Sequence, residues 1–119
     1  MSEPTTGAAV SGGLVVYIGT KPTMTYVFQV VAQLNSGAGP VLVKARGNVI
    51  GKAVDIAEVV RRRFLPGQVD LGEIRIDTER LVNRDGRETN VSSITIPLVR
   101  NGAPPPPAAV GAAGSLPAR

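Results

Sequence analysis

The sequence contains no cysteine, no histidine and no tryptophan among its 119 residues. Without thiols and imidazoles, the chain cannot form a disulfide and lacks the usual zinc ligands, a thiol nucleophile and an imidazole base. It also has no apolar run of about 18 residues that could span a membrane, and its start does not resemble a signal peptide. These absences argue against catalytic residues and therefore against an enzyme. They also argue against a bound metal, a cofactor and a membrane partner, and they predict a cytoplasmic protein.

Aromatic residues are scarce as well, because Tyr17, Tyr26, Phe28 and Phe64 are the only four. The hydrophobic fraction of 43% must therefore come mainly from aliphatic side chains, and the length permits one domain. Residues 1–12 are mostly Gly, Ser, Thr, Pro and Ala with one charge, and residues 101–119 contain four consecutive prolines and a Gly/Ala stretch. We predict two flexible tails, with a domain over residues 13–100 between them.

Positive charge is unevenly distributed along the chain. The net charge is +4, and residues 13–66 contain seven basic side chains against two acidic ones, whereas residues 67–102 contain five against six. A clustered positive field is what a polyanionic partner requires, since neutralised phosphates release their counterions. The alternative is that these basic residues only keep the surface soluble.

The first half of the domain predicts two strands and two helices. The apolar run 14–18 is typical of a covered strand, and a helix begins at Pro22 and ends at Asn35-Ser36-Gly37. A second strand over residues 40–46 places Lys44 and Arg46 on one face. A second helix covers residues 49–64, ends in three arginines and is stopped by Pro66-Gly67. The apolar stripes expected to face the core are Met24, Val27, Phe28, Val31 and Leu34 in the first helix and Ile50, Ala53, Val54, Ala57 and Val60 in the second.

The second half predicts a long hairpin. Strands over residues 69–83 and 87–100 are joined at Asp85-Gly86, a dipeptide favoured in two-residue type I′ turns. Apolar residues nearly vanish between residues 77 and 90, so this part should project as an arm of about 30 Å. Pro97 has no backbone N–H to donate to a neighbouring strand, so this side of its backbone should face solvent or a bulge. The order β-α-β-α-β-β predicts an α+β two-layer sandwich, with a four-stranded mixed sheet covered by two helices and extended by the hairpin arm.

Five segments resemble the Alba family of archaeal chromatin proteins, and the similarity runs from about residue 14 to residue 100. They are Ile18-Gly19-Thr20-Lys21-Pro22, Val43-Lys44-Ala45-Arg46-Gly47, Lys52-Ala53-Val54-Asp55, Arg63-Phe64-Leu65-Pro66 and Asp85-Gly86-Arg87. The resemblance implies a chromosome-associated protein that coats and compacts double-stranded DNA without sequence preference and also binds RNA. It further implies a homodimer, or a heterodimer with a paralogous Alba chain, whose two arms reach along the duplex.

The resemblance also implies roles for particular residues. Lys21 matches the loop lysine, Lys44 and Arg46 the cations of the body, and Arg87 the arginine of the arm tip. Phe64 matches the aromatic residue that stacks dimers side by side. The nucleic-acid-binding residues expected are Thr20, Lys21, Lys44, Arg46, Asn48, Lys52, Arg84, Arg87 and Asn90. The residues expected between dimers are Arg62, Arg63, Phe64 and Leu65.

Three positions depart from the family pattern. Thr20 replaces the first of two loop lysines, an acetylation site, so acetylation control of this loop is not implied here. Asn48 and Asn90 stand where arginines are expected, and their amides can still hydrogen-bond phosphate or a base edge.

Simpler interpretations of the same residues stay open. Lys44 and Arg46 can be solvated, Arg84 and Arg87 can belong to a polar turn, the arginines 61–63 can be a solvated helix end, and Phe64 can be core. Two other functions are also compatible with the sequence: an RNA-binding ribonucleoprotein subunit, and a protein-interaction adaptor that uses the Pro-rich tail.

Overall fold

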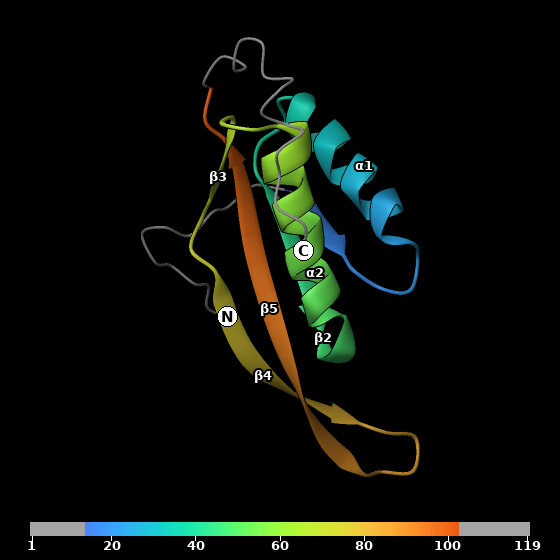
Figure 1. Ribbon diagram of the computed structural model, residues 1–119. Helices are drawn as coiled ribbons and strands as arrows, with labels where there is room; N and C mark the ends of the chain where they lie inside the picture. The colour runs from blue at the N-terminus through green and yellow to red at the C-terminus, as the bar shows by residue number, and fades with distance from the viewer. Residues whose placement is uncertain (1–13, 103–119) are drawn as a thin grey trace.

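The computed structural model describes residues 14–102 and confirms the α+β class and the expected order of elements (Figure 1). The strands are β1 (Leu14–Tyr17), β2 (Val41–Arg46), β3 (Val69–Leu71), β4 (Arg75–Val82) and β5 (Glu88–Arg100). The helices are α1 (Thr23–Asn35) and α2 (Ile50–Val59), with a 3-10 turn η1 (Gly47–Val49) before α2 and a π-helical turn η2 (Val60–Phe64) after it.

The two predicted tails lie outside the described residues, except for residues 101 and 102. Asn101, the first residue of the predicted C-terminal tail, is bonded to the body. Its backbone N–H donates to Gln68 O at 3.0 Å, and its side-chain amide donates to Gly67 O and Asp70 Oδ1. The Pro-rich segment on which the adaptor interpretation depends is outside the described range.

Both helices form where the sequence predicts them, but the buried stripe of each is rotated from the expected one. Helix α1 buries Tyr26, Val27, Val30 and Leu34, while Met24 and Phe28 are exposed. Helix α2 buries Ala53, Ile56 and Ala57, and Val54 is 42% exposed. Both helices have apolar residues on more than half of their circumference, so spacing alone could not decide which side meets the sheet.

The sheet has five strands rather than the predicted four, in the order β1-β2-β5-β3, with β4 also paired to β5. The predicted strand over residues 69–83 is interrupted between Leu71, which is opposite Leu98, and Arg75, which is opposite Thr95. Three residues therefore face two residues of β5, which is a bulge. Gly72 N–H donates to Pro97 O at 2.8 Å, so Pro97 turns its backbone toward the bulge, as predicted.

The helices cover one face of the sheet and leave the other face open. Both helices contact β2, and α1 also contacts β1 while α2 contacts β5. Alternate strand residues enter this layer, such as Val41, Val43 and Ala45 of β2 opposite Leu98, Ile96 and Ile94 of β5. The core is aliphatic apart from Tyr26, which agrees with the composition.

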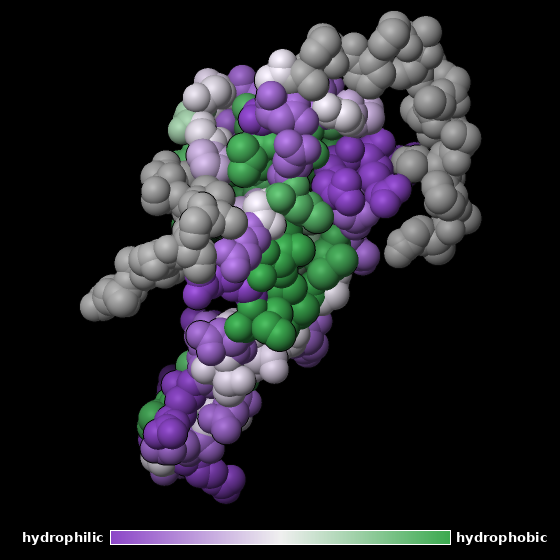
Figure 2. Space-filling view, turned by 90° about the vertical axis from the view of Figure 1, so that its left-hand side faces the viewer, coloured by the Kyte–Doolittle hydropathy of each residue, from purple (hydrophilic) through white to green (hydrophobic). Residues whose placement is uncertain are grey.

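The edge formed by β3 and β4 extends beyond the helices. Ile76 is opposite Ile94 on the helix side of the sheet, yet it is 79% exposed, and its neighbours Leu71 and Ile74 are 38% and 46% exposed. Figure 2 views the molecule from this side and shows apolar side chains gathered in one patch above the polar arm. We call Leu71, Ile74 and Ile76 the edge patch.

The arm is present as predicted, but its turn is one residue wider. The last β4–β5 pair is Val82 with Glu88, and the turn is closed by hydrogen bonds from Asn83 N–H to Arg87 O and from Gly86 N–H to Asn83 O. Gly86 has φ +86° and is the last residue of the turn instead of lying at its centre. This is the three-residue class of hairpin, and the Asp85 carboxylate favours it by accepting the Arg87 N–H at 3.1 Å.

Within residues 14–102, the helices are too short or too polar for any of them to cross a bilayer.

Candidate nucleic-acid interface

Most of the predicted contact residues gather at one end of the sheet, beside the root of the arm. Strands β1 and β2 are parallel, so the loop after β1 and the turn after β2 leave the sheet at the same end. Arg46, the last residue of β2, is opposite Ser93, where β5 passes from the body into the arm. The loop 18–22, the end of β2 and η1 therefore lie next to one another (Figure 1).

The loop that carries Lys21 is held by two side chains from the helices. The Tyr26 hydroxyl accepts the Gly19 N–H at 2.8 Å and the Lys21 N–H at 3.2 Å. Lys52 Nζ donates to Gly19 O at 2.9 Å and to Lys21 O, and it lies 5.3 Å from the Tyr26 ring centroid. The Lys21 side chain is left exposed. Lys52 thus directs its ammonium into the loop, whereas the sequence suggested a cation that contacts nucleic acid itself.

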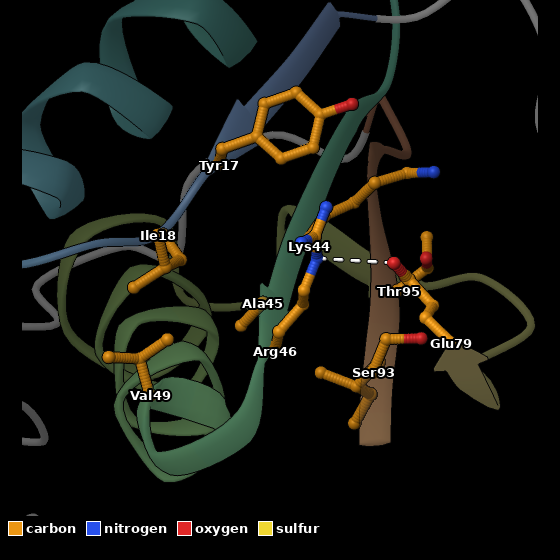
Figure 3. A pocket seen from close by; sticks show the side chains of 10 residues that line it. Tyr17, Ile18, Lys44, Ala45, Arg46, Val49, Glu79, Ser93 and Thr95 are labelled. Atoms are coloured by element: carbon orange, nitrogen blue, oxygen red, sulfur yellow. Dashed lines mark ion pairs between the residues drawn. The ribbon is translucent and has the colours of Figure 1, made fainter. Parts of the chain in front are cut away.

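Lys44 and Arg46 both lie on the open face of the sheet, as the alternation of β2 predicts. They line a hollow of about 530 Å³ together with Tyr17, Glu79, Ser93 and Thr95 (Figure 3). Arg46 Nε is 3.2 Å from Glu79 Oε1, and the two side chains point toward one another. Glu79 and Tyr17 could not be assigned to this site from the sequence, because only strand register places them beside Lys44 and Arg46.

The remaining predicted contact residues are exposed but separated into two places. Two of them are in the body: Thr20 lies in the loop 18–22 and Asn48 lies in η1. Arg84, Arg87 and Asn90 are on the arm. Arg87 Nε is 3.9 Å from Asp85 Oδ2, and Arg84 has no ion pair within the described residues. The body and arm groups therefore reach a common ligand only if that ligand extends along the arm.

The residues predicted between dimers lie at the end of the second helix. Phe64 is 37% exposed and meets Phe28 of α1 edge to face, with ring centroids 5.7 Å apart. Leu65 is 6% exposed and belongs to the core, so its side chain is not available to a partner. Arg63 is exposed, and it forms no ion pair with any residue in the described range.

Glu58 neutralises part of the basic helix end. Its carboxylate accepts hydrogen bonds from Arg61 Nε at 3.0 Å and from Arg62 Nε at 2.6 Å. Partial burial opposes ionisation of Glu58, but the bond from Arg62 and the charges of Arg61 and Arg62 outweigh it and hold the pKa of this carboxyl below its ordinary value. Glu58 is one carboxylate beside three arginines, so net positive charge remains at this helix end, as it does at Lys21 in the loop 18–22.

Comparisons with known proteins agree on one family. The Alba family model matches residues 14–78. The chain is 52% identical to the DNA/RNA-binding protein Alba of Nanoarchaeum equitans over 86 residues, which cover 71% of this chain and 96% of that protein. It is 51% identical to the DNA/RNA-binding protein Alba 1 of Archaeoglobus fulgidus over 85 residues, which cover 71% and 93%.

Solved structures lead to the same result. Alba from Thermoplasma volcanium aligns with a TM-score of 0.67 and 49% identity, over 72% of this chain and 99% of that one. ALBA1 from Trypanosoma brucei shares the fold with a TM-score of 0.56 and 24% identity, over 72% of this chain and 68% of that one. The sequence match and the shared fold together establish that this chain belongs to the Alba family.

Proposed function

We propose that this protein is a sequence-nonspecific, double-stranded DNA-binding architectural protein that coats and compacts DNA as a dimer and also binds RNA. The observation that carries the proposal is the gathering of Lys21, Lys44 and Arg46 at the one end of the sheet from which the arm extends. The archaeal relatives at 51% and 52% identity are named DNA/RNA-binding proteins, which supports the same ligand class. Such a protein would be chromosome-associated.

The chemistry of this surface suits a phosphate backbone better than a small anion. Its cations are exposed, apart from the half-buried Lys44, and are spread over a loop, a strand and a long hairpin, and they do not converge on one point. The molecule is 56 Å long, whereas duplex DNA presents one charge per about 1.7 Å of helix axis. An extended set of cations on such a polymer gives binding that depends strongly on salt and weakly on sequence.

The proposed contacts divide into direct and indirect ones. Lys21, Lys44 and Arg46 would bind phosphates from the body, while Thr20 and Asn48 would add hydrogen bonds. Arg84, Arg87 and Asn90 would do so from the arm. Lys52 would act indirectly, by holding the backbone carbonyls of Gly19 and Lys21 so that the Lys21 side chain stays directed to solvent.

The edge patch is where we place the dimer contact. Leu71, Ile74 and Ile76 are exposed at the sheet edge that extends beyond the helices, and exposed apolar patches of this kind mark interaction sites. A second copy of the chain would bury Ile76 and supply a second arm. A paralogous Alba chain with a similar edge would fit the same place, and the stoichiometry of the purified protein distinguishes the two. Contacts between dimers would use Phe64 with its partner Phe28, together with Arg62 and Arg63.

The test is a titration of the purified protein with a random-sequence DNA duplex and a structured RNA of equal length, at low and moderate salt. We expect duplex affinity to fall steeply with salt, and the Lys21→Ala and Lys44→Ala variants to flatten the slope by about one unit per lost phosphate contact. Arg61→Ala, which removes the same charge from the Glu58 pair, is the control and should change the slope little. A salt-independent affinity would refute the proposal, and a clear preference for RNA would favour the ribonucleoprotein alternative.

A further inference from the structure

The two tyrosines of the chain have opposite environments. Tyr26 is 5% exposed, and its hydroxyl accepts two backbone N–H groups of the loop 18–22. Tyr17 is 69% exposed, and its hydroxyl and ring have no hydrogen-bond, ring or cation partner within the part of the chain that the structure describes. The fold therefore accounts for Tyr26 but not for Tyr17.

Strand register places Tyr17 in the hollow on the open face. Val16 and Ile18 point into the core, so Tyr17 must project from the opposite face, where its cross-strand partner in β2 is Lys44. Figure 3 shows the ring on the same side as the Lys44 and Arg46 side chains. The hollow thus presents a free aromatic face, two cations on the neighbouring strand, and the hydroxyls of Ser93 and Thr95 on the strand after it.

We propose that this hollow is a binding site for an unpaired nucleotide, with Tyr17 as the residue on which the base stacks. The proposal rests on the proposed function and specifies a second ligand class for the same protein, namely single-stranded or bulged nucleic acid. Aromatic side chains on an open sheet face, flanked by cations, are a recurring means of binding single strands, because every base offers a flat face.

Each part of the hollow has a chemical role in this arrangement. Lys44 and Arg46 bind the phosphates on the two sides of the stacked base. Ser93 and Thr95 can donate to or accept from base edges or a ribose hydroxyl, and Glu79 can accept from an exocyclic amino group. A base inside a regular duplex is already stacked on both faces and cannot lie on Tyr17. Within the hollow, duplex binding therefore uses the cations without the ring, and single-strand binding uses the cations and the ring.

The test compares the Tyr17→Leu and Tyr17→Phe variants with the unchanged protein. Leucine keeps an apolar side chain on the strand but removes the flat ring, whereas phenylalanine keeps the ring. Because Tyr17 is largely exposed, both variants should fold, and circular dichroism melting confirms it. Affinities are measured by fluorescence anisotropy with a labelled single-stranded oligouridylate and with a labelled random DNA duplex at one salt concentration.

We expect Tyr17→Leu to bind the oligouridylate about tenfold more weakly, the size of effect that loss of base stacking produces. It should bind the duplex within about twofold of the unchanged protein, and Tyr17→Phe should match the unchanged protein on both ligands. Full single-strand affinity in Tyr17→Leu, or an equal loss on both ligands, would overturn the base site while leaving the duplex proposal intact. Failure of Lys21→Ala to weaken duplex binding would instead count against the proposed function.

Intrinsic fluorescence supplies an independent readout, since the chain has two tyrosines and no tryptophan. Stacking of a base on Tyr17 should quench the tyrosine emission of the unchanged protein when the oligouridylate is added. In Tyr17→Phe only Tyr26 emits, and its emission should not fall. Equal quenching in both proteins would overturn the assignment of Tyr17.

Discussion

The ion pair between Arg46 and Glu79 yields a quantitative prediction about affinity. Arg46 Nε lies 3.2 Å from Glu79 Oε1, and the two side chains are 53% and 39% exposed, so the pair stabilises the fold by only about 0.5 kcal/mol. A phosphate bound by Arg46 would lie about 7 Å from the Glu79 carboxylate. At that separation the repulsion is about 0.6 kcal/mol in water and about 2.4 kcal/mol at an effective dielectric constant of 20.

Glu79→Gln should therefore tighten duplex binding by about 1 kcal/mol per subunit, or about fivefold, at low salt. The gain should shrink as salt increases, because the repulsion is screened. Fluorescence anisotropy with a random duplex measures both effects. The matched control is Asp70→Asn, which removes one carboxylate charge near the opposite end of β5, where Asp70 is opposite Val99, and keeps an acceptor for the Asn101 amide.

An affinity that is unchanged or weaker in Glu79→Gln, with Asp70→Asn neutral, would refute this reasoning. It would mean that Glu79 orients Arg46 for the ligand and does not compete with it. An equal gain in both variants would show that net charge, and not the position of Glu79, determines the affinity.

Four further substitutions test the loop, the edge patch, the end of the second helix and the Glu58 ion pairs. Lys52→Met should release the loop carbonyls and weaken duplex binding about as much as Lys21→Ala does; light-scattering stoichiometry stays unchanged if the effect is local. Ile76→Asp should convert the proposed dimer to a monomer in size-exclusion chromatography with light scattering, because each subunit would bury a charge in the edge patch; a stable dimer would place the contact elsewhere. Phe64→Ala should reduce the cooperativity of binding on a long duplex and leave single-site affinity intact; an equally steep isotherm contradicts the stacking role. For Glu58 the folded-state pKa is lowered, so its ion pairs stabilise the fold above the ordinary value of 4.5 and this contribution is lost as pH falls through the lowered value. Glu58→Gln should thus lower the melting temperature by a few degrees, about 1 kcal/mol or less, near pH 7, and the difference should shrink as pH falls below 4.5.

Local sequence chemistry predicted the order of the helices and the hairpin, but not the break in the strand over residues 69–83 or the side that each helix buries. Asp85-Gly86 located the hairpin, and Pro97 predicted either solvent or a bulge beside it, of which the structure has the bulge that contains Gly72. The run 14–18 is apolar throughout, so it has no alternation to distinguish the buried Val16 from the exposed Tyr17. The spacing of apolar residues identifies the buried face of a strand or helix only where polar residues occupy the opposite face.

For the candidate site, the sequence predicts which cations share a face when they are close together in one strand. It does not predict contacts between residues that are far apart in the chain. Lys44 and Arg46 share a face because they are two residues apart in one strand. Glu79 meets Arg46 only because both strands pair with β5 in a particular register, which the intervening bulge shifts by one residue. The role of Lys52 was not predicted for the same reason, since it depends on loop carbonyls more than thirty residues earlier in the chain.

The arm of this protein can keep the same residues on each face only if it is lengthened in discrete steps. The β4–β5 pairing continues without a bulge from Arg75 opposite Thr95 to Val82 opposite Glu88, so alternate residues keep to one face along its whole length. Adding one residue to each strand would turn every side chain beyond the insertion to the opposite face. Adding two residues to each strand preserves the faces and extends the reach by about 7 Å, which is about two base pairs of duplex. Chains built on this plan can therefore change how much DNA one subunit covers in units of two base pairs, without altering the body that folds beneath the arm.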